Sequence, residues 1–161
     1  MLQTEYMINI NDMLKIFLSA MTPIGELRVS IPFGLSILKQ PWYFVFVISV
    51  IGNMIPPFFI LWLFPKISAW LMSNSQLMNK FLNWLFERTR KKTKDKIDKY
   101  GDLALIIFVA IPLPNTGAWT GTLAAWLFGI PMKRALLNIF YGVLIAGIIV
   151  TMITSGLINF L

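Results

Sequence analysis

The sequence contains no cysteine and no histidine, and only seven of its 161 residues are acidic. Without cysteine there is no disulfide, no thiolate nucleophile and no sulfur ligand for a metal. Without histidine there is no imidazole base and no ordinary zinc or haem ligand. Most of the carboxylates lie in or beside one polar segment, which is a poor basis for a hydrolase site. We therefore expect neither an enzyme nor a resident metal or other cofactor.

Charge is scarce and unevenly distributed along the chain. Charged residues make up 13% and hydrophobic residues 57%, whereas a soluble domain carries about 25% charged residues to cover its surface. No charge occurs between Lys39 and Lys66, between Asp102 and Lys133, or beyond Arg134. Each of these gaps exceeds the ~20 residues that cross a bilayer as a helix. The sequence therefore predicts an all-α integral membrane protein.

Two hydrophobic stretches are interrupted near their centres by proline and glycine, and an uncharged segment follows each of them. Proline removes a backbone donor and glycine weakens a helix, so each stretch is expected to form a re-entrant helical hairpin followed by a transmembrane helix. The expected single membrane domain, 1–161, holds repeat 1 at 12–64 (hairpin 12–39, span 41–64) and repeat 2 at 103–161 (hairpin 103–130, span 132–161). The expected hairpin breaks are Pro23, Gly25, Pro32, Pro112, Pro114 and Gly121.

The two halves also share a spacing, because eleven residues separate Pro41 from Gly52 and Pro131 from Gly142. If each hairpin enters and leaves on one side, each half crosses the membrane once and the two repeats are inverted. Inverted repeats with broken helices near the midplane are a transporter architecture. The alternative counts both broken stretches as full spans, and it moves Lys133 and Arg134 from the inside to the outside.

The segment between the repeats, residues 65–102, carries nine basic and four acidic residues. The positive-inside rule places this loop in the cytoplasm of a multi-pass protein of the cell (plasma) membrane. Hydrophobic residues recur with helical spacing before the basic run, which predicts an amphipathic helix on the membrane surface. Anionic lipid headgroups account for the positive charge, so we expect membrane lipids and no nucleic acid as partners.

Glu26 and Arg28 are the only acid and base inside a hydrophobic stretch away from its ends. Burying either in a bilayer costs at least ~2.5–3.5 kcal/mol, so both are candidate substrate-binding residues. The planar guanidinium group of Arg28 can donate two parallel hydrogen bonds to a phosphate or carboxylate. Glu26 is also a candidate for proton coupling, since burial favours the neutral form of a carboxyl group. The alternative is a structural ion pair that holds the hairpins together.

The break in the second hairpin has no charge but offers hydroxyl, amide and indole groups. A half-helix that starts near Thr116 would direct its first N–H groups inward, where they could bind an anion. The candidate binding residues there are Asn115, Thr116, Gly117 and Trp119. The alternative is a tightly packed break that satisfies its own polar groups. In the first span, Asn53 should face protein or a cavity, because lipid cannot satisfy its amide.

Two motifs carry a resemblance to a known family. Glu26-Leu27-Arg28 with Ile31-Pro32, and Pro112-Leu113-Pro114 followed by Thr116-Gly117-Ala118-Trp119 and Gly121, are similar to the two signatures of the putative small multidrug export protein family. That family resembles the wider DedA/VTT (SNARE-associated) membrane protein superfamily. The resemblance implies paired re-entrant hairpins, transport of lipids such as polyprenyl phosphates, and Glu26 and Arg28 at a polar hairpin tip. One departure is that the second hairpin lacks the arginines expected in the DedA proteins.

Three functions remain open from the sequence. The first is a small DedA-like transporter of a lipid or amphipathic anionic substrate, such as a polyprenyl phosphate or phospholipid, with possible proton coupling. The second is a small exporter of drugs or cations, in which Glu26 exchanges a proton for the cation. The third is a non-transporting membrane adaptor whose basic segment recruits a partner. Two hairpins and two spans make a thin wall around a pathway, so we expect a homodimer.

Overall fold

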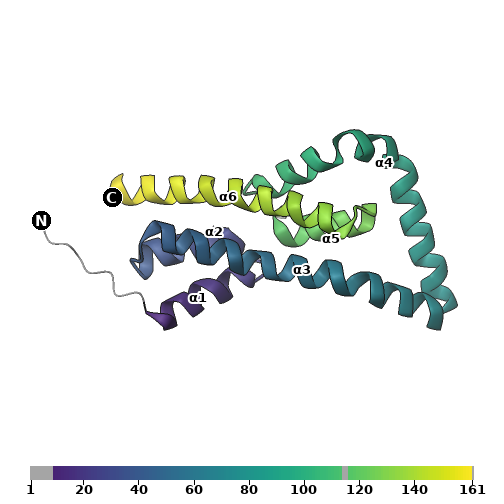
Figure 1. The fold of residues 1–161 in the computed structure, drawn as a ribbon, viewed down its shortest axis with the longest axis horizontal. Helices are drawn as coiled ribbons and strands as arrows, with labels where there is room; N and C mark the ends of the chain where they lie inside the picture. The colour runs from purple at the N-terminus through teal and green to yellow at the C-terminus, as the bar shows by residue number, and fades with distance from the viewer. Residues whose placement is uncertain (1–8, 114–115, 161) are drawn as a thin grey trace, which may run out of the picture. The chain divides into compact units, whose positions relative to one another are not determined.

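The computed structural model describes the backbone of residues 9–113 and 116–160, and their side chains except at 90–99 and 157–160. Within these residues every regular element is helical (Figure 1). The elements are α1 (Ile10–Met21), α2 (Glu26–Pro32), the π-helix η1 (Phe33–Ile37), α3 (Trp42–Asn74), α4 (Gln76–Ala110), α5 (Ala118–Phe128) and α6 (Met132–Phe160). The all-helical prediction is therefore confirmed for the described part of the chain.

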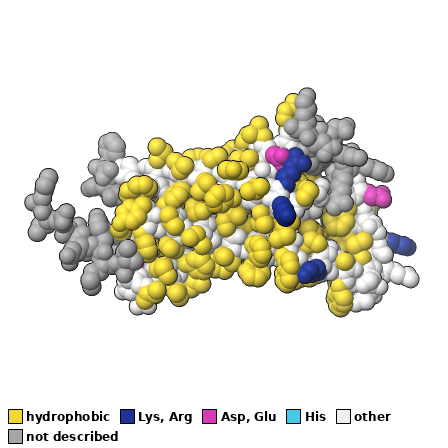
Figure 2. Space-filling view, in the orientation of Figure 1, with side chains coloured by type: hydrophobic (Ala, Val, Ile, Leu, Met, Phe, Trp, Pro, Cys, Tyr) yellow, Lys and Arg dark blue, Asp and Glu magenta, His cyan; other side chains and the backbone are white. Residues whose placement is uncertain are grey.

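Two of the helices, α3 and α6, are long and apolar enough to cross a membrane. They contain the two segments for which the sequence predicts transmembrane helices. α3 continues ten residues beyond the expected end of the span at 64, and it runs through Pro56, Pro57 and Pro65. Large hydrophobic side chains remain exposed on these helices, such as Val47, Phe59 and Ile148. Figure 2 shows hydrophobic side chains over much of the visible face, as expected for a surface that contacts lipid.

The polar linker contributes to two helices and is not a separate element. Residues up to Asn74 complete α3, and α4 then begins at Gln76 behind a capping serine, since Ser75 Oγ accepts a hydrogen bond from the N–H of Met78 (3.4 Å). From there α4 continues without interruption through the basic run to Ala110. The boundary expected between 102 and 103 is a change of polarity inside one helix, because neither proline nor a turn-forming cluster stops the helix there.

The chain divides into two compact units, and each contains one hairpin. Unit 1 comprises the chain up to Ile55 together with residues from Val143 onward, so it holds α1, α2, η1, the first part of α3 and the last part of α6. Unit 2 runs from Pro56 to Gly142 and holds the rest of α3, α4, α5 and the first part of α6.

In unit 1, glycines allow the hairpin to pack closely on α3. A Cβ added to Gly34 would lie 2.6 Å from Cγ1 of Val45, and one added to Gly52 would lie 2.7 Å from the carbonyl oxygen of Phe17. Both distances are too short for a real Cβ contact. The close approach of η1 and α1 to α3 therefore depends on the absence of side chains at these two positions.

Unit 2 uses the same device between its hairpin and α6. A Cβ added to Gly142 would lie 2.9 Å from the carbonyl oxygen of Ile106, and one added to Gly121 would lie 2.5 Å from Cγ2 of Val109. Gly142 is therefore a close-packing point between α6 and α4. Gly121 lies inside α5 and not in the break between the helices, because its role is to let α5 approach α4.

Candidate functional site

The first hairpin turns between α1 and α2 through Thr22, Pro23, Ile24 and Gly25. The hydroxyl of Thr22 donates to the carbonyl of Ser19 (2.8 Å) and accepts from the N–H of Gly25 (3.1 Å). A Cβ on Gly25 would lie 2.5 Å from Oγ1 of Thr22. Pro23 and Gly25 thus form the expected break, and the threonine holds it in shape.

Glu26 follows this turn as the first residue of α2 and is only 6% exposed. Its φ of 45° lies in the left-handed region, which a residue with a side chain adopts at a cost of about 1–3 kcal/mol. The backbone therefore departs from regular helix at the start of α2, next to Arg28. Arg28 lies one residue beyond Leu27 within the helix and is half-buried.

A buried polar stripe runs between α2 and α3. The hydroxyl of Ser30 donates to Oγ of Ser49 at 2.9 Å, and neither side chain is exposed. One helical turn further along α3, Asn53 is 1% exposed, which confirms that it faces protein and not lipid. Among the described residues, no hydrogen-bond partner reaches its Oδ1. The sequence analysis singled out Asn53 but not the two serines. Buried serines are common in contacts between helices, so their presence in a hydrophobic stretch does not mark a site.

Pro32 ends α2 but does not break the hairpin. The chain continues directly into the π-helix η1, whose wider turn follows the loss of the proline N–H from the hydrogen-bond ladder. At the far end of this hairpin, Nε2 of Gln40 donates to Oδ2 of Asp12 at 3.1 Å. The start and the end of the segment thus lie side by side. Lys15 also binds Asp12, with Nζ and Oδ1 3.3 Å apart.

The break in the second hairpin is organised by Thr116, one of the candidate binding residues. Its hydroxyl lies 2.7 Å from the carbonyl oxygens of both Ile111 and Leu113 and accepts from the N–H of Leu113 (3.2 Å). These contacts serve the turn itself, in agreement with the alternative of a self-satisfied break. Pro112 lies in this turn, whereas Pro114 and Asn115 lie outside the described residues.

Gly117 and Trp119 mark the start of the second half-helix. Gly117 has φ 128° and ψ −169°, a backbone conformation that is essentially restricted to glycine. The α5 helix begins directly after it at Ala118, close to the expected start near Thr116, and Gly117 provides no capping side chain. Trp119 is half-buried in the first turn. Because glycine has no side chain, Gly117 cannot cap the first N–H groups of α5.

The end of the second hairpin is closed by Asp102. Nε of Arg134 lies 2.6 Å from its Oδ1 and 2.8 Å from its Oδ2, and the amide of Asn138 also donates to Oδ1. The Arg134 guanidinium lowers the pKa of this carboxyl against the opposing effect of desolvation, with further help from Asn138. Among the described residues no three acidic side chains gather in a way that could hold a metal ion.

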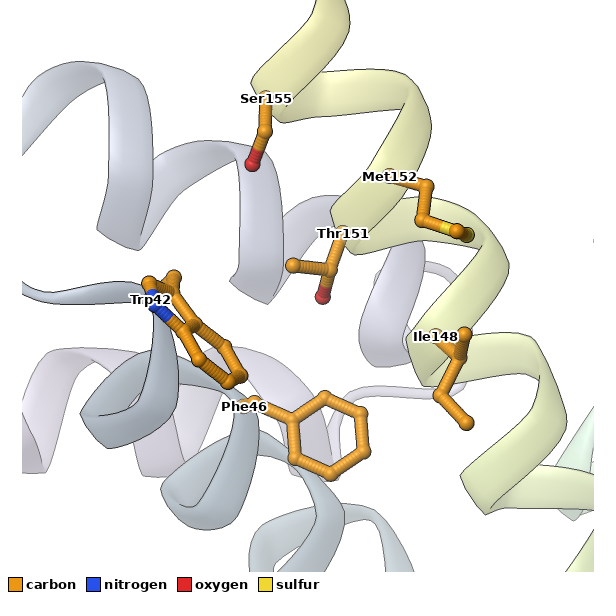
Figure 3. Close-up of a pocket in the computed structure, with 6 residues that line it drawn as sticks. All are labelled: Trp42, Phe46, Ile148, Thr151, Met152 and Ser155. Atoms are coloured by element: carbon orange, nitrogen blue, oxygen red, sulfur yellow. The ribbon is translucent and has the colours of Figure 1, made fainter.

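Unit 1 also contains an apolar groove of about 490 Å³ between the start of α3 and the end of α6 (Figure 3). Trp42 and Phe46 line it from α3, and α6 contributes Ile148, Thr151, Met152 and Ser155. None of these side chains is charged. The hydroxyl oxygen of Thr151 is buried without a hydrogen-bond partner among the described residues. The sequence could not reveal the groove, because its two walls are about a hundred residues apart.

The groove and the tip of the first hairpin are separate places in unit 1. Trp42 lies beside Gln40 at the base, whereas Asn53 is eleven residues further along α3. At 1.5 Å per residue this separation is about 16 Å. A long amphipathic molecule could reach from one to the other, but a small polar ligand could not occupy both.

Comparison with known proteins identifies a matching family. The family described as "Putative small multi-drug export protein" matches residues 26–149, which is more than three quarters of the chain and includes Glu26, Arg28 and the second break. No curated protein and no solved structure matches.

Proposed function

Because the chain belongs to the small multi-drug export protein family, we propose that it is a transporter that moves an amphipathic compound across the cell membrane. The burial of Glu26 at the tip of the first hairpin supports the proposal most strongly. An ionisable side chain inside a membrane is costly and marks a pathway for ions or substrates. In this proposal Glu26 couples transport to protons and Arg28 binds the polar group of the substrate.

The proposed architecture is a pair of inverted repeats, each with a re-entrant hairpin and one transmembrane helix. A re-entrant hairpin must begin and end on the same side of the membrane. The contacts of Asp12 with Gln40 and of Asp102 with Arg134 support this arrangement, because they join the beginning and the end of each hairpin. The basic linker then lies in the cytoplasm, and both hairpins point toward the bilayer centre.

An anionic lipid, such as a polyprenyl phosphate or a phospholipid, is the substrate that we favour. The guanidinium of Arg28 suits a phosphate, since Arg can donate two parallel hydrogen bonds to it. The uncharged groove suits a hydrocarbon chain. At the second hairpin, the first N–H groups of α5 and the side chain of Trp119 are proposed as a separate contact for an anionic headgroup.

Export of small drugs is the second candidate, and the lining of the groove favours it. Two aromatic side chains, Trp42 and Phe46, and no charged ones face the groove. A flat, apolar or weakly cationic compound could stack there and then move on to Glu26, which would exchange its proton for the cation. This function also agrees most directly with the name of the family.

Reconstitution into liposomes tests both candidates. Headgroup quenching of a fluorescent lipid measures lipid movement, and loss of a fluorescent cation from the vesicles measures drug export. We expect Arg28→Ala to abolish lipid movement while Arg28→Lys retains part of it, and Glu26→Gln to abolish proton-driven transport. Equal rates for the wild type and all three variants would reject the proposed roles of both residues.

The proposal also includes an oligomeric state, and a rival function can be separated from it. Two spans and two hairpins leave a thin wall around a pathway, so we propose a homodimer, which native mass spectrometry of the detergent-solubilised protein can detect. A non-transporting adaptor would behave differently. Its function would survive changes to Glu26 and Arg28 but would be lost when the basic residues of the linker are neutralised.

A further inference from the structure

One acceptor in the core of unit 1 lacks a donor. The side chain of Asn53 is 1% exposed, and its Oδ1 has no hydrogen-bond partner among the described residues. Buried polar atoms in native proteins nearly always have a partner, so such an atom needs a specific explanation. The backbone adds a second acceptor without a donor. Pro57 has no N–H that could donate to the carbonyl of Asn53 one turn earlier. At this level α3 therefore offers acceptors and lacks a donor.

Two contacts define how the second half of the hairpin lies along α3. Gly34 lies against Val45, where an added Cβ would be 2.6 Å from Cγ1 of the valine. One turn earlier in the hairpin, Ser30 is hydrogen-bonded to Ser49, one turn later on α3. Going back four residues in one element thus moves the contact forward four residues in the other, as expected for antiparallel helices in a fixed register.

One more turn in the same register places Glu26 opposite Asn53. The neighbouring residue gives an independent check, because a Cβ on Gly52 would lie 3.1 Å from the Cβ of Ala20, close to the tip where α1 ends. Glu26 begins α2 directly after that tip. Four side chains that are each more than nine-tenths buried lie along this register: Glu26, Ser30, Ser49 and Asn53.

We infer that Glu26 carries a proton and donates it in a hydrogen bond to Oδ1 of Asn53. The inference rests on the proposed coupling role of Glu26 and specifies the group that holds its proton in place. A protonated carboxyl group has one O–H donor, which is the group that Asn53 lacks, whereas a carboxylate only accepts. Asn53 is therefore a positioning residue for the acid that carries the proton.

A metal cation fits this place less well than a proton. Hard cations take about six oxygen ligands. The hydroxyls of Ser30 and Ser49 are bonded to each other, which leaves few side-chain oxygens for a cation in the stripe. A single missing donor is supplied by one proton. The ion bound at this position in unit 1 is thus a proton and not sodium.

Few other charges lie near this proton. Among the described residues of unit 1, Arg28 is the ionisable group that shares the tip with Glu26, and the part of α6 in this unit has none. The other ionisable side chains are near the base of the hairpin: Asp12, Lys15, Lys39 and Tyr43. An anionic substrate on Arg28 would therefore favour the protonated acid, and its departure would favour release of the proton.

Infrared spectroscopy of the protein in liposomes at neutral pH tests the inference without a transport assay. We expect a C=O stretching band of a protonated carboxyl group in the wild type and its loss in Glu26→Gln. In Asn53→Ala the band should shift to higher wavenumber, because the O–H group has lost its acceptor. Asn138→Ala is the matched control, since it removes a buried asparagine of unit 2 and should leave the band in place.

Thermal unfolding in detergent gives a second readout that does not depend on the folding of Asn53→Ala. Glu26→Gln keeps a donor for Asn53 and should unfold near the wild-type temperature, whereas Glu26→Leu removes the donor and should unfold at a clearly lower temperature. Absence of the band in the wild type, a band that Asn53→Ala does not move, or equal unfolding of the two Glu26 variants would overturn the inference. A normal band with no measurable transport would reject the proposed function alone.

Discussion

In each hairpin, an aspartate near the start of the apolar segment binds a side chain close to the proline that precedes α3 or α6. Asp12 binds Gln40 beside Pro41, and Asp102 binds Arg134 just after Pro131. A glycine eleven residues after the proline then packs on a carbonyl oxygen of the first half-helix, as Gly52 does on Phe17 and Gly142 on Ile106. Each unit thus builds its hairpin with equivalent contacts.

The tips of the two hairpins differ in chemistry. The first has Glu26 buried in a strained conformation with Arg28 close by, whereas the described part of the second is uncharged and is held together by the hydroxyl of Thr116. The second hairpin shows that this type of fold forms without a buried charge at its tip. The acid and base of the first hairpin are therefore not requirements of folding, which supports their assignment to function.

The largest expected effect separates the acid at the tip from the acid at the base. Glu26→Gln should lower proton-driven transport in liposomes by about a hundredfold or more, the loss typical of a side chain that transfers protons. Asp102→Asn should leave transport nearly unchanged, because this carboxyl serves the closure of its own hairpin. Equal losses of transport in the two variants would contradict the assignment of proton coupling to Glu26 at the tip.

The shared contacts can be tested at the two equivalent glycines. Gly52→Ala and Gly142→Ala each place a Cβ within 3 Å of a backbone oxygen, so each should lower the free energy of unfolding by about 1–3 kcal/mol. Thermal unfolding in detergent measures the loss. Gly156→Ala is the control, because nothing lies within 4 Å of an added Cβ there. A loss at only one of the two glycines would break the equivalence of the hairpins.

The threonines at the two turns should have a smaller and similar effect. Thr22 and Thr116 each hold their turn with hydroxyl hydrogen bonds to the backbone. Replacing either by valine should lower the free energy of unfolding by about 1 kcal/mol, since a typical hydrogen bond contributes this much. Hydrogen exchange of the amides in each turn would locate the change. No change at either turn would mean that the threonines do not hold them.

The smallest effect concerns Asp102 and pH. Its ion pair with Arg134 is about half exposed, so it should stabilise unit 2 by roughly 0.2–1 kcal/mol. Because Arg134 lowers the pKa of Asp102, this stability is present above the ordinary value of 3.8 and is lost as the pH falls through the lower pKa of the folded protein. Asp102→Asn should thus unfold more easily than wild type at pH 7, and the difference should be smaller at pH 2. A constant difference between these pH values would contradict the ion pair.

The sequence predicted the parts of this molecule that depend on local patterns and on burial. Charge-free stretches located α3 and α6, and the cost of burying charge or amide groups identified Glu26 and Asn53. It did not predict the end of α3 or the continuity of α4, because prolines within a long apolar helix and a change of polarity do not stop a helix by themselves.

Contacts between distant segments were beyond the reach of the sequence. The groove joins α3 to α6, and the bond between Ser30 and Ser49 depends on the register of two helices. Gly121 looked like part of a break and is a packing residue, since the same absence of a side chain serves either purpose. Such distinctions require the positions of neighbouring helices.

The account depends most on the proposal that both hairpins enter and leave the membrane on one side. The chain has no native cysteine, so single cysteines can be placed at Lys133 and at Arg88 in the basic linker and labelled with a membrane-impermeant maleimide in intact cells and in inverted vesicles. Re-entrant hairpins predict that Lys133→Cys is labelled from the same side as Arg88→Cys. Labelling of Lys133→Cys from the opposite side would show that the second hydrophobic stretch crosses the membrane, and it would contradict the account.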